Sequence, residues 1–204
     1  MDIILLAAGL SKRMGQNNKL LMDWKGEAAV VHCAEVALSA VVASKAGRLV
    51  VVTGYQDKMV RTAIKDKIGI NPNYVFYTNK EYEKGQFTSL QAGLKACALM
   101  DTAKNNLSSF MVALSDMPII TKEDYLQLIE ISEQYKDYDF VRPIYNKKPG
   151  HPVVCSGNFR KEVLNMPQNS QMKNLLSMHK VKEVIWTNNN VIKDFDTLAE
   201  YKEL

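Results

Sequence analysis

Three observations predict an α/β fold, in which helices cover both faces of a doubly wound and mostly parallel sheet. Short apolar runs alternate along the 204-residue chain with longer segments of helical spacing. Several of these runs are apolar at consecutive positions, as in strands buried on both faces of a parallel sheet. The composition, 47% hydrophobic and 24% charged, is ordinary for a globular protein. With no linker, repeat or low-complexity tract in the sequence, residues 1–204 are expected to form a single three-layer α/β/α domain.

The first part of the chain supplies four strands that alternate with helices. Residues 3–8 are an apolar run, and the alanine-rich segment 27–43 has helical spacing. Residues 48–54 form the next buried strand, which ends at a glycine. Further along, the pattern predicts a helix at 56–67, a strand at 74–79, a helix at 88–100 and a strand at 110–115.

The second part of the chain begins with a helix at 122–136, where Thr121 is expected to be the N-cap. Residues 140–145 and 151–155 are interpreted as two strands, and Pro143 and Pro149 indicate an edge or a long hairpin there. Short helices near 157–165 and 171–178, a strand at 183–186 and a terminal helix from Thr197 complete the prediction.

Charge and cysteine usage exclude some classes of function. The formal net charge is +4, but acidic and basic residues are mixed throughout, so no basic arm for nucleic acid is expected. Cys33, Cys97 and Cys155 lie far apart and are interpreted as buried thiols, which favours a reducing compartment. The first apolar run is too short to span a membrane and lacks the pattern of a signal peptide. We therefore expect a cytoplasmic protein that binds neither a membrane nor nucleic acid.

A loop rich in small and basic residues follows the first predicted strand. Gly9 and Gly15 let the backbone approach an anion closely, and Arg13 and Lys19 supply positive charge. The spacing matches neither a Walker phosphate loop nor a dinucleotide-binding loop. A connection with incidental basic residues is the weaker interpretation, because glycine, serine and three cations occur together. The sequence thus predicts a phosphate-binding loop of a third type.

Other polar residues follow predicted strands and are expected to meet this loop in one crevice at the carboxyl ends of the strands. Asn79 and Ser89 belong to one such segment. Asp116 follows the strand at 110–115, where its carboxylate suits Mg²⁺ but equally suits a turn before a proline. Asp194 is a candidate second metal ligand, with a structural role equally open. His151, between a glycine and a proline, either orients a second substrate or satisfies a turn.

Taken together and in order, these motifs resemble the molybdenum-cofactor nucleotidyltransferase family, on its cytidylyltransferase side. Residues 6–15 carry its pattern Leu-Ala-Ala-Gly-x-Ser-x-Arg-Met-Gly, and residues 85–93 resemble Gly-x-x-Ser-Ser-Leu-x-x-Gly. Residues 114–118 resemble the metal motif Leu-x-Asp-x-Pro, residues 150–152 are Gly-His-Pro, and residues 194–197 resemble Asp-Ile-Asp-Thr. The match covers nearly the whole chain.

This resemblance implies a Rossmann-like fold of the nucleotide-diphospho-sugar transferase type and transfer of CMP from CTP to the phosphate of molybdopterin, with release of pyrophosphate. It implies that Arg13, Lys19 and Asp116 are catalytic and that Mg²⁺ is held by Asp116 and Asp194. It places His151 at the acceptor, and implies that a molybdenum hydroxylase receives the product. The nucleotide-binding residues that it implies are Leu6, Ala7, Ala8, Gly9, Ser11, Arg13, Lys19, Asn79 and Ser89.

Two departures from the family pattern bear on substrate choice. Three residues separate Gly15 from Lys19 where two are usual, and residues 167–173 replace the family's Gly-Asp-x-Gly-Ala-Arg turn on the acceptor side. The resemblance also implies CTP in preference to GTP, because this chain has Ala7-Ala8-Gly9 where guanylyl-transferring relatives tend to show Ala-Gly-Gly. Two alternatives stay open. One is transfer of a cytidylyl or guanylyl group to another phosphorylated acceptor, such as a sugar or isoprenoid precursor. The other is a non-catalytic binding protein that assists maturation of a molybdenum hydroxylase.

Overall fold

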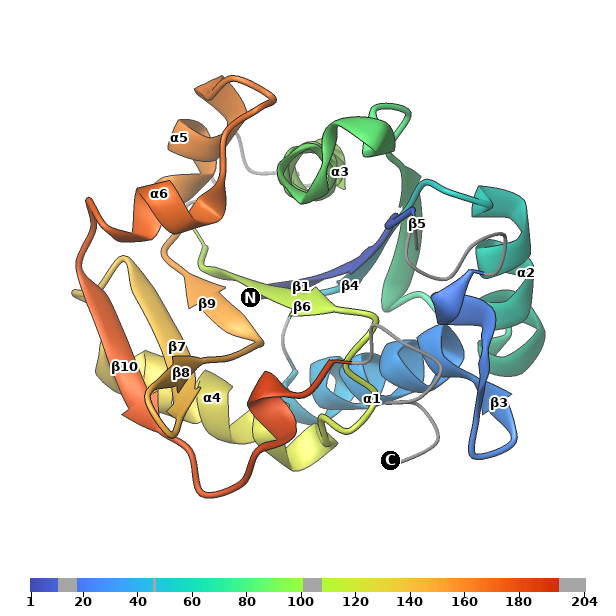
Figure 1. The fold of residues 1–204 in the computed structure, drawn as a ribbon, viewed down its shortest axis with the longest axis horizontal. Coiled ribbons are helices and arrows are strands. Elements are labelled where there is room, and N and C mark those ends of the chain that lie inside the picture. Colours follow the sequence, from blue (N-terminus) through green and yellow to red (C-terminus); the bar gives the residue numbers. More distant parts are fainter. Residues whose placement is uncertain (11–17, 46, 101–107, 195–204) are drawn as a thin grey trace.

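A computed structural model describes residues 1–10, 18–45, 47–100 and 108–194 of the chain. The central sheet has the strand order β10-β7-β9-β6-β1-β4-β5, with β8 paired to β7 (Figure 1). Its strands are β1 (Asp2–Ala7), β4 (Leu49–Thr53), β5 (Tyr74–Thr78), β6 (Phe110–Leu114), β7 (Phe140–Tyr145), β8 (Lys148–Pro149), β9 (Val153–Cys155) and β10 (Val181–Ile185). A separate small hairpin pairs β2 (Asp23–Trp24) with β3 (Glu27–Ala28).

Two groups of helices cover the faces of this sheet (Figure 1). On one face lie α1 (Ala29–Ser44), α2 (Asp57–Ile68) and α4 (Lys122–Gln134), and on the other lie α3 (Gln86–Met100), α5 (Phe159–Asn165) and α6 (Met172–Leu176). Short 3₁₀ turns are η2 (Lys19–Leu21), η3 (Tyr82–Lys84) and η4 (Asn190–Ile192). The predicted three-layer α/β arrangement is therefore confirmed. None of the helices in the described part of the chain is both long and apolar enough to cross a membrane.

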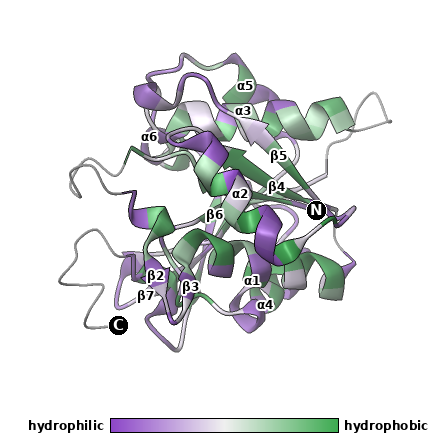
Figure 2. Ribbon diagram, turned by 90° about the vertical axis from the view of Figure 1, so that its right-hand side faces the viewer, coloured by the Kyte–Doolittle hydropathy of each residue, from purple (hydrophilic) through white to green (hydrophobic). Residues whose placement is uncertain are grey.

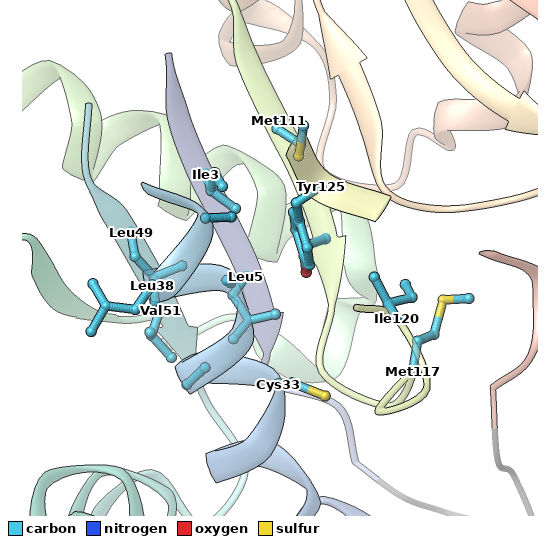
Figure 3. Packing of buried hydrophobic residues seen from close by; sticks show 14 of the residues in the cluster. Ile3, Leu5, Cys33, Leu38, Leu49, Val51, Met111, Met117, Ile120 and Tyr125 are labelled. Atoms are coloured by element: carbon cyan, nitrogen blue, oxygen red, sulfur yellow. The ribbon is translucent and has the colours of Figure 1, made fainter. Parts of the chain in front are cut away.

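The centre of the sheet is parallel, and the helices that connect its strands bury them on both faces. β1 pairs in parallel with β4 and with β6, and all six of its residues are buried. Figure 2 shows these central strands as hydrophobic between the two helical layers. On one face, Ile3, Leu5 and Met111 pack against residues of α1 and α4, including Cys33 and Tyr125 (Figure 3). The second core lies between the same strands and α3.

Two strands, β8 and β9, run against the others, and β8 pairs only with β7 among the described strands. β9 is antiparallel to both of its neighbours, with Val153 opposite Val112 of β6 and Val154 opposite Val141 of β7. Because β9 is reversed, its first residues lie at the edge of the sheet where β6 ends. This arrangement brings the turn at Gly150 and His151 to the same edge as the loop after β1.

Several elements differ from the predictions in detail. The segment 27–43 begins with β3 rather than with helix, because the chain reverses at Lys25 and Gly26, both with positive φ. The helix expected at 88–100 begins two residues earlier, directly after Gly85. Of the two readings of the proline-rich region, the hairpin is the one observed, since β7 pairs with β8 and lies inside the sheet.

Other predictions are confirmed at the level of single residues. Thr121 caps α4 and forms a capping box with Asp124. All three cysteines are free and buried. The terminal helix expected from Thr197 lies outside the described residues.

Candidate active site

A cavity of about 360 Å³ opens at the carboxyl ends of β1 and β6. The end of β1 and the loop after it contribute Leu6, Ala8 and Gly9, and the end of β6 contributes Asp116. The opposite wall is formed by η3 and the first turn of α3, including Ser89. Three segments that are far apart in sequence thus meet here, as expected for a parallel α/β sheet.

The only charged groups that face each other at close range in this cavity, among the described residues, are Lys19 and Asp116. Lys19 Nζ lies 2.6 Å from Asp116 Oδ2, and the side chains are 13% and 22% exposed. The other carboxylate oxygen, Oδ1, is buried and has no hydrogen-bond partner in the described part of the chain. A buried carboxylate oxygen without a donor is a costly arrangement unless a cation completes it. The residues present therefore fit a divalent metal at Asp116.

Neighbouring residues fix the position of Asp116. Ser115 donates two hydrogen bonds to the carbonyl oxygen of Leu6 on β1. One comes from its backbone nitrogen at 3.3 Å and the other from its hydroxyl oxygen Oγ at 2.7 Å. The Cys33 thiol of α1 donates to the Ser115 carbonyl oxygen at 3.4 Å. Burial raises the pKa of this thiol, and the charge of Asp116 raises it further, so Cys33 stays protonated. The cysteine is a packing residue that supports the strand end.

Lys19 is held by the short turn η2. The side chain of Asn18 caps this turn, because its Oδ1 accepts from the backbone nitrogen of Leu20 at 3.1 Å. Leu20 is buried and anchors the turn in the core. Asn18, directly before Lys19, thus caps the turn that directs the ammonium group to Asp116. Ser11 and Arg13 lie outside the described residues.

Ser89 faces the cavity, whereas Asn79 lies behind it. Asn79 is 4% exposed, and its Nδ2 donates to Ser89 Oγ at 3.0 Å and to Thr88 Oγ1 at 2.9 Å. Its Oδ1 accepts from the backbone nitrogen of Glu81 at 2.9 Å. Since these bonds occupy the amide, we interpret Asn79 as a residue that positions Ser89. Ala7 likewise packs into the core, with 1% of its surface exposed.

Close packing sets the width of the cavity beside Ala8. A Cβ atom on Gly54 would lie 2.9 Å from Cβ of Ala8 and 2.6 Å from Cβ of Tyr82. Real Cβ atoms do not approach so closely, so position 54 accepts only glycine without movement of its neighbours. Tyr82 also lines the cavity. The glycine that ends β4 thereby lets η3 approach the loop after β1.

A second cavity of about 660 Å³ adjoins the first, and both are lined by Leu6 and Gln86. Its walls are mostly apolar and come from β6, β9, α3 and α6, with Arg142, His151 and Lys173 as the basic groups. Arg142 forms an ion pair with Glu183 of β10. The cavity therefore suits a ligand with a sizeable, weakly polar body.

His151 lines this second cavity, close to the end of β6. Extension of the β6–β9 register places it level with Leu114, two residues before Asp116. Its backbone nitrogen donates to Val191 O at 2.8 Å, and a Cβ on Gly150 would lie 2.3 Å from that same oxygen. The pKa of the imidazole is lowered to about 4, mainly because the ring is buried. The negative charge of Asp116 raises this pKa, and the positive charge of Arg142 lowers it. His151 is thus neutral near pH 7.

Asp194 is exposed and follows η4, the turn that carries Val191. The structure consequently brings the segment before Asp194 to the Gly150–His151 turn. In the described part of the chain no three His, Cys, Asp or Glu side chains cluster in a way that would hold a metal ion by themselves. Mg²⁺ prefers few carboxylates together with phosphate oxygens and water, so the role of Asp194 stays a prediction.

A family model, the MobA-like NTP transferase domain, matches residues 3–184. This chain belongs to that family. It is accordingly a nucleotidyltransferase, and the predicted family is confirmed. The matched region includes both cavities.

Individual proteins also resemble this nucleotidyltransferase. It is 25% identical over 200 residues to the molybdenum cofactor cytidylyltransferase of Escherichia coli K12, covering 98% of this chain and 93% of the relative. It is 26% identical over 167 residues to nicotine blue oxidoreductase of Paenarthrobacter nicotinovorans, covering 78% and 72%. The crystal structure of Rv0371c from Mycobacterium tuberculosis H37Rv superposes with a TM-score of 0.76 at 21% identity, covering 99% and 95%. Its manganese complex superposes with a TM-score of 0.71 at 18% identity, covering 99% and 96%.

Sequence reasoning missed several residues of this transferase's cavities. Tyr82 and Gln86 line the first cavity, and Arg142 and Lys173 line the second. Gln86 and Lys173 had a usable signal, because they lie in the segments 85–93 and 167–173 that were compared with the family pattern. Arg142 had none, since it reaches the cavity only through the pairing of β7.

Proposed function

We propose that this protein transfers CMP from CTP to the phosphate of molybdopterin and releases pyrophosphate. The observation that carries the proposal is the Lys19–Asp116 pair with its unpartnered carboxylate oxygen, in a cavity that adjoins a second one. One cavity takes the nucleotide and the other takes the acceptor. A protein that only bound a cofactor would not need a metal-binding carboxylate in the first cavity.

In this assignment the nucleotide lies in the first cavity, along the loop after β1. Backbone N–H groups from Ala8 to Gly9 and the cations Arg13 and Lys19 bind the triphosphate. Ser11 and Ser89 contact the nucleotide, with Asn79 supporting Ser89. The backbone and side chains of Leu6, Ala7 and Ala8 shape the rest of the site. When the nucleotide binds, Lys19 exchanges part of its contact with Asp116 for a phosphate.

Asp116, together with Asp194, would hold Mg²⁺. The metal, when bound, supplies positive charge that lowers the energy of the charged phosphates and of the departing pyrophosphate. The unpartnered Oδ1 of Asp116 supports this assignment from the structure itself. A site for a metal–triphosphate requires a cation for the phosphates and a carboxylate for the metal, and Lys19 and Asp116 would supply them.

The reaction needs no general base. An ionised phosphate oxygen of the acceptor attacks the α-phosphorus of CTP, the new P–O bond forms, and the bond to the β-phosphate breaks with its electrons leaving on pyrophosphate. Catalysis then consists of positioning and charge stabilisation. Neutral His151 orients the acceptor by hydrogen bonding without adding a charge near the metal. The mostly apolar second cavity holds the body of the acceptor.

Selection of CTP is supported by the Ala7-Ala8-Gly9 sequence and by similarity to a cytidylyltransferase over nearly the full length. Delivery of the product to a molybdenum hydroxylase is part of the same proposal.

The experiment measures pyrophosphate release by the purified protein with Mg²⁺, molybdopterin and either CTP or GTP. We expect release only when molybdopterin is present, and at least tenfold faster with CTP. The Asp116→Ala variant is the control for catalysis by this site. Binding of molybdopterin without pyrophosphate release would refute catalysis. Release with a sugar or isoprenoid phosphate but not with molybdopterin would refute the assigned acceptor.

A further inference from the structure

The two cavities meet at a junction formed by two side chains. Leu6 of β1 and Gln86 of α3 line both of them. In the proposed function, on which this inference rests, the reacting phosphorus belongs to the nucleotide in one cavity and the attacking oxygen belongs to the acceptor in the other. The two atoms must therefore meet beside Leu6 and Gln86.

Of these two side chains, only Gln86 offers polar groups. Leu6 is apolar and 8% exposed. Gln86 is an exposed residue, and its side chain forms no hydrogen bond with the other described residues. A carboxamide has two N–H donors, and phosphate oxygens accept such bonds readily. The junction thus presents an uncommitted donor at the place where the charge of two phosphates accumulates.

The backbone that carries Gln86 is held firmly. The preceding Gly85 has φ +114, a conformation that side chains rarely adopt, and it allows α3 to begin at Gln86. Thr88 Oγ1 lies 2.8 Å from the carbonyl oxygen of Gly85 and 2.9 Å from that of Glu81, so its single hydroxyl proton is shared between the two. These bonds fix the first turn of the helix against η3.

The same helical turn separates the two cavities. Ser89, three residues after Gln86, lines the nucleotide cavity, whereas Leu90, four residues after it, lines the acceptor cavity. Gln86 therefore stands on the boundary between the two faces. Its position follows from the helix geometry and does not depend on a mobile loop.

We propose that Gln86 is a catalytic residue that donates hydrogen bonds from its carboxamide to the phosphate oxygens of the acceptor and of the α-phosphate during transfer. It moves no proton: the acceptor oxygen bonds to the α-phosphorus, and pyrophosphate leaves with the electron pair. The carboxamide is neutral, so it stabilises the approach of two anions without retaining the pyrophosphate product. Removing one donor of this kind from a transition state costs about 100- to 1000-fold in rate.

The test compares Gln86→Leu and Gln86→Glu with the wild type. Because Gln86 is exposed, neither change should unfold the protein. The control is Gln127→Leu, the same substitution at an exposed position of α4 on the opposite face of the sheet. The measurements are the Kd of CTP with Mg²⁺, by titration calorimetry, and kcat and KM for molybdopterin from pyrophosphate release.

For Gln86→Leu we expect kcat to fall about 100-fold while the Kd of CTP changes less than threefold. The kcat of Gln86→Glu should fall further, because the introduced carboxylate repels both phosphates. Gln127→Leu should behave as the wild type. An active wild type with a Gln86→Leu variant of unchanged kcat would overturn the role of Gln86 and leave the proposed function intact. A wild type that releases no pyrophosphate with molybdopterin would overturn both.

Discussion

Lys19 Nζ and Asp116 Oδ2 lie 2.6 Å apart although 97 positions separate them in the sequence. The ammonium group neutralises a carboxylate that has one further oxygen without a partner among the described residues. In the proposed function the same pair serves the metal–triphosphate, since the cation can turn to phosphate and the carboxylate to the metal. The two side chains would then balance each other's charge whenever they do not contact the substrate.

Replacing Asp116 tests this relationship directly. We expect Asp116→Ala to abolish transfer, because the carboxylate proposed to hold the metal is lost together with its ion pair to Lys19. The fold should persist, with Tm lowered by about 2–4 °C per kcal/mol lost. Pyrophosphate release and thermal unfolding measure the two effects. Asp66→Ala, at an exposed position of α2, is the matched control. Normal turnover of Asp116→Ala would exclude the metal assignment.

Substitutions of Asn79 and Ser89 should have different effects, one mainly on the free energy of unfolding and the other mainly on nucleotide binding. Asn79→Ala removes a buried amide that makes three hydrogen bonds, so the free energy of unfolding should fall by about 1–3 kcal/mol. Ser89→Ala leaves the bond from Asn79 to Thr88 in place and should mainly weaken CTP binding. Urea unfolding and CTP titration distinguish the variants. Equal losses of stability in both would show that Asn79 does not act by supporting the turn.

Gly150→Ala should affect the acceptor and not the nucleotide. The added Cβ would lie 2.3 Å from Val191 O, so the Gly150–His151 turn must shift away from η4. We expect KM for the acceptor to rise at least tenfold while the Kd of CTP stays within twofold. A change confined to CTP binding would contradict the division of the site between two cavities.

His151 should make the protein less stable in acid. Its folded pKa, about 4, lies below the ordinary value of 6.5 because burial disfavours the charged ring. Between pH 6.5 and 4 the unfolded chain takes up a proton at this ring that the folded chain does not, so stability falls as the pH falls. The loss is at most about 3 kcal/mol. Urea unfolding at pH 7 and at pH 4.5 measures it, and His151→Gln should lose less stability than the wild type between the two.

His179 should affect the pH dependence of stability in the direction opposite to that of His151. Burial lowers its pKa, but its contacts with Glu162 and Asp139 outweigh burial and raise the pKa above the ordinary value. The stability that it contributes is present below that ordinary value and is lost as the pH rises through the raised pKa. His179→Gln should therefore lose stability relative to the wild type at pH 5.5 more than at pH 8. The reverse order would show that the carboxylates do not hold the ring charged.

The sequence allowed most of the elements to be predicted but not their order in the sheet. β1, β4 and β6 are continuous apolar runs, and such runs signal strands buried on both faces. The insertion of β9 between β6 and β7 has no local signal, because pairing between distant strands leaves no mark on either of them. The hairpin of β2 and β3 was missed because strands of two residues show no periodicity.

The candidate site was predictable where a residue follows a strand. Lys19, Ser89 and Asp116 meet in one cavity, as the carboxyl ends of parallel strands require. Gln86 and Arg142 were not predicted, because their positions depend on where a helix begins and on which strands become neighbours. The burial of Asn79 could not be predicted either, because a polar residue after a strand supports a neighbouring residue as often as it contacts a ligand.

The reversed strand β9 has a consequence for how such enzymes diversify. Among the described residues, the first cavity is lined only by residues up to Asp116, whereas the second cavity also draws on residues 142–177. These later residues belong to elements that take no part in the pairing of β1 with β4 and β6, so changes among them leave that pairing untouched. In the proposed function, a new acceptor specificity can therefore evolve in the later part of the chain while the earlier part keeps the groups that bind the triphosphate.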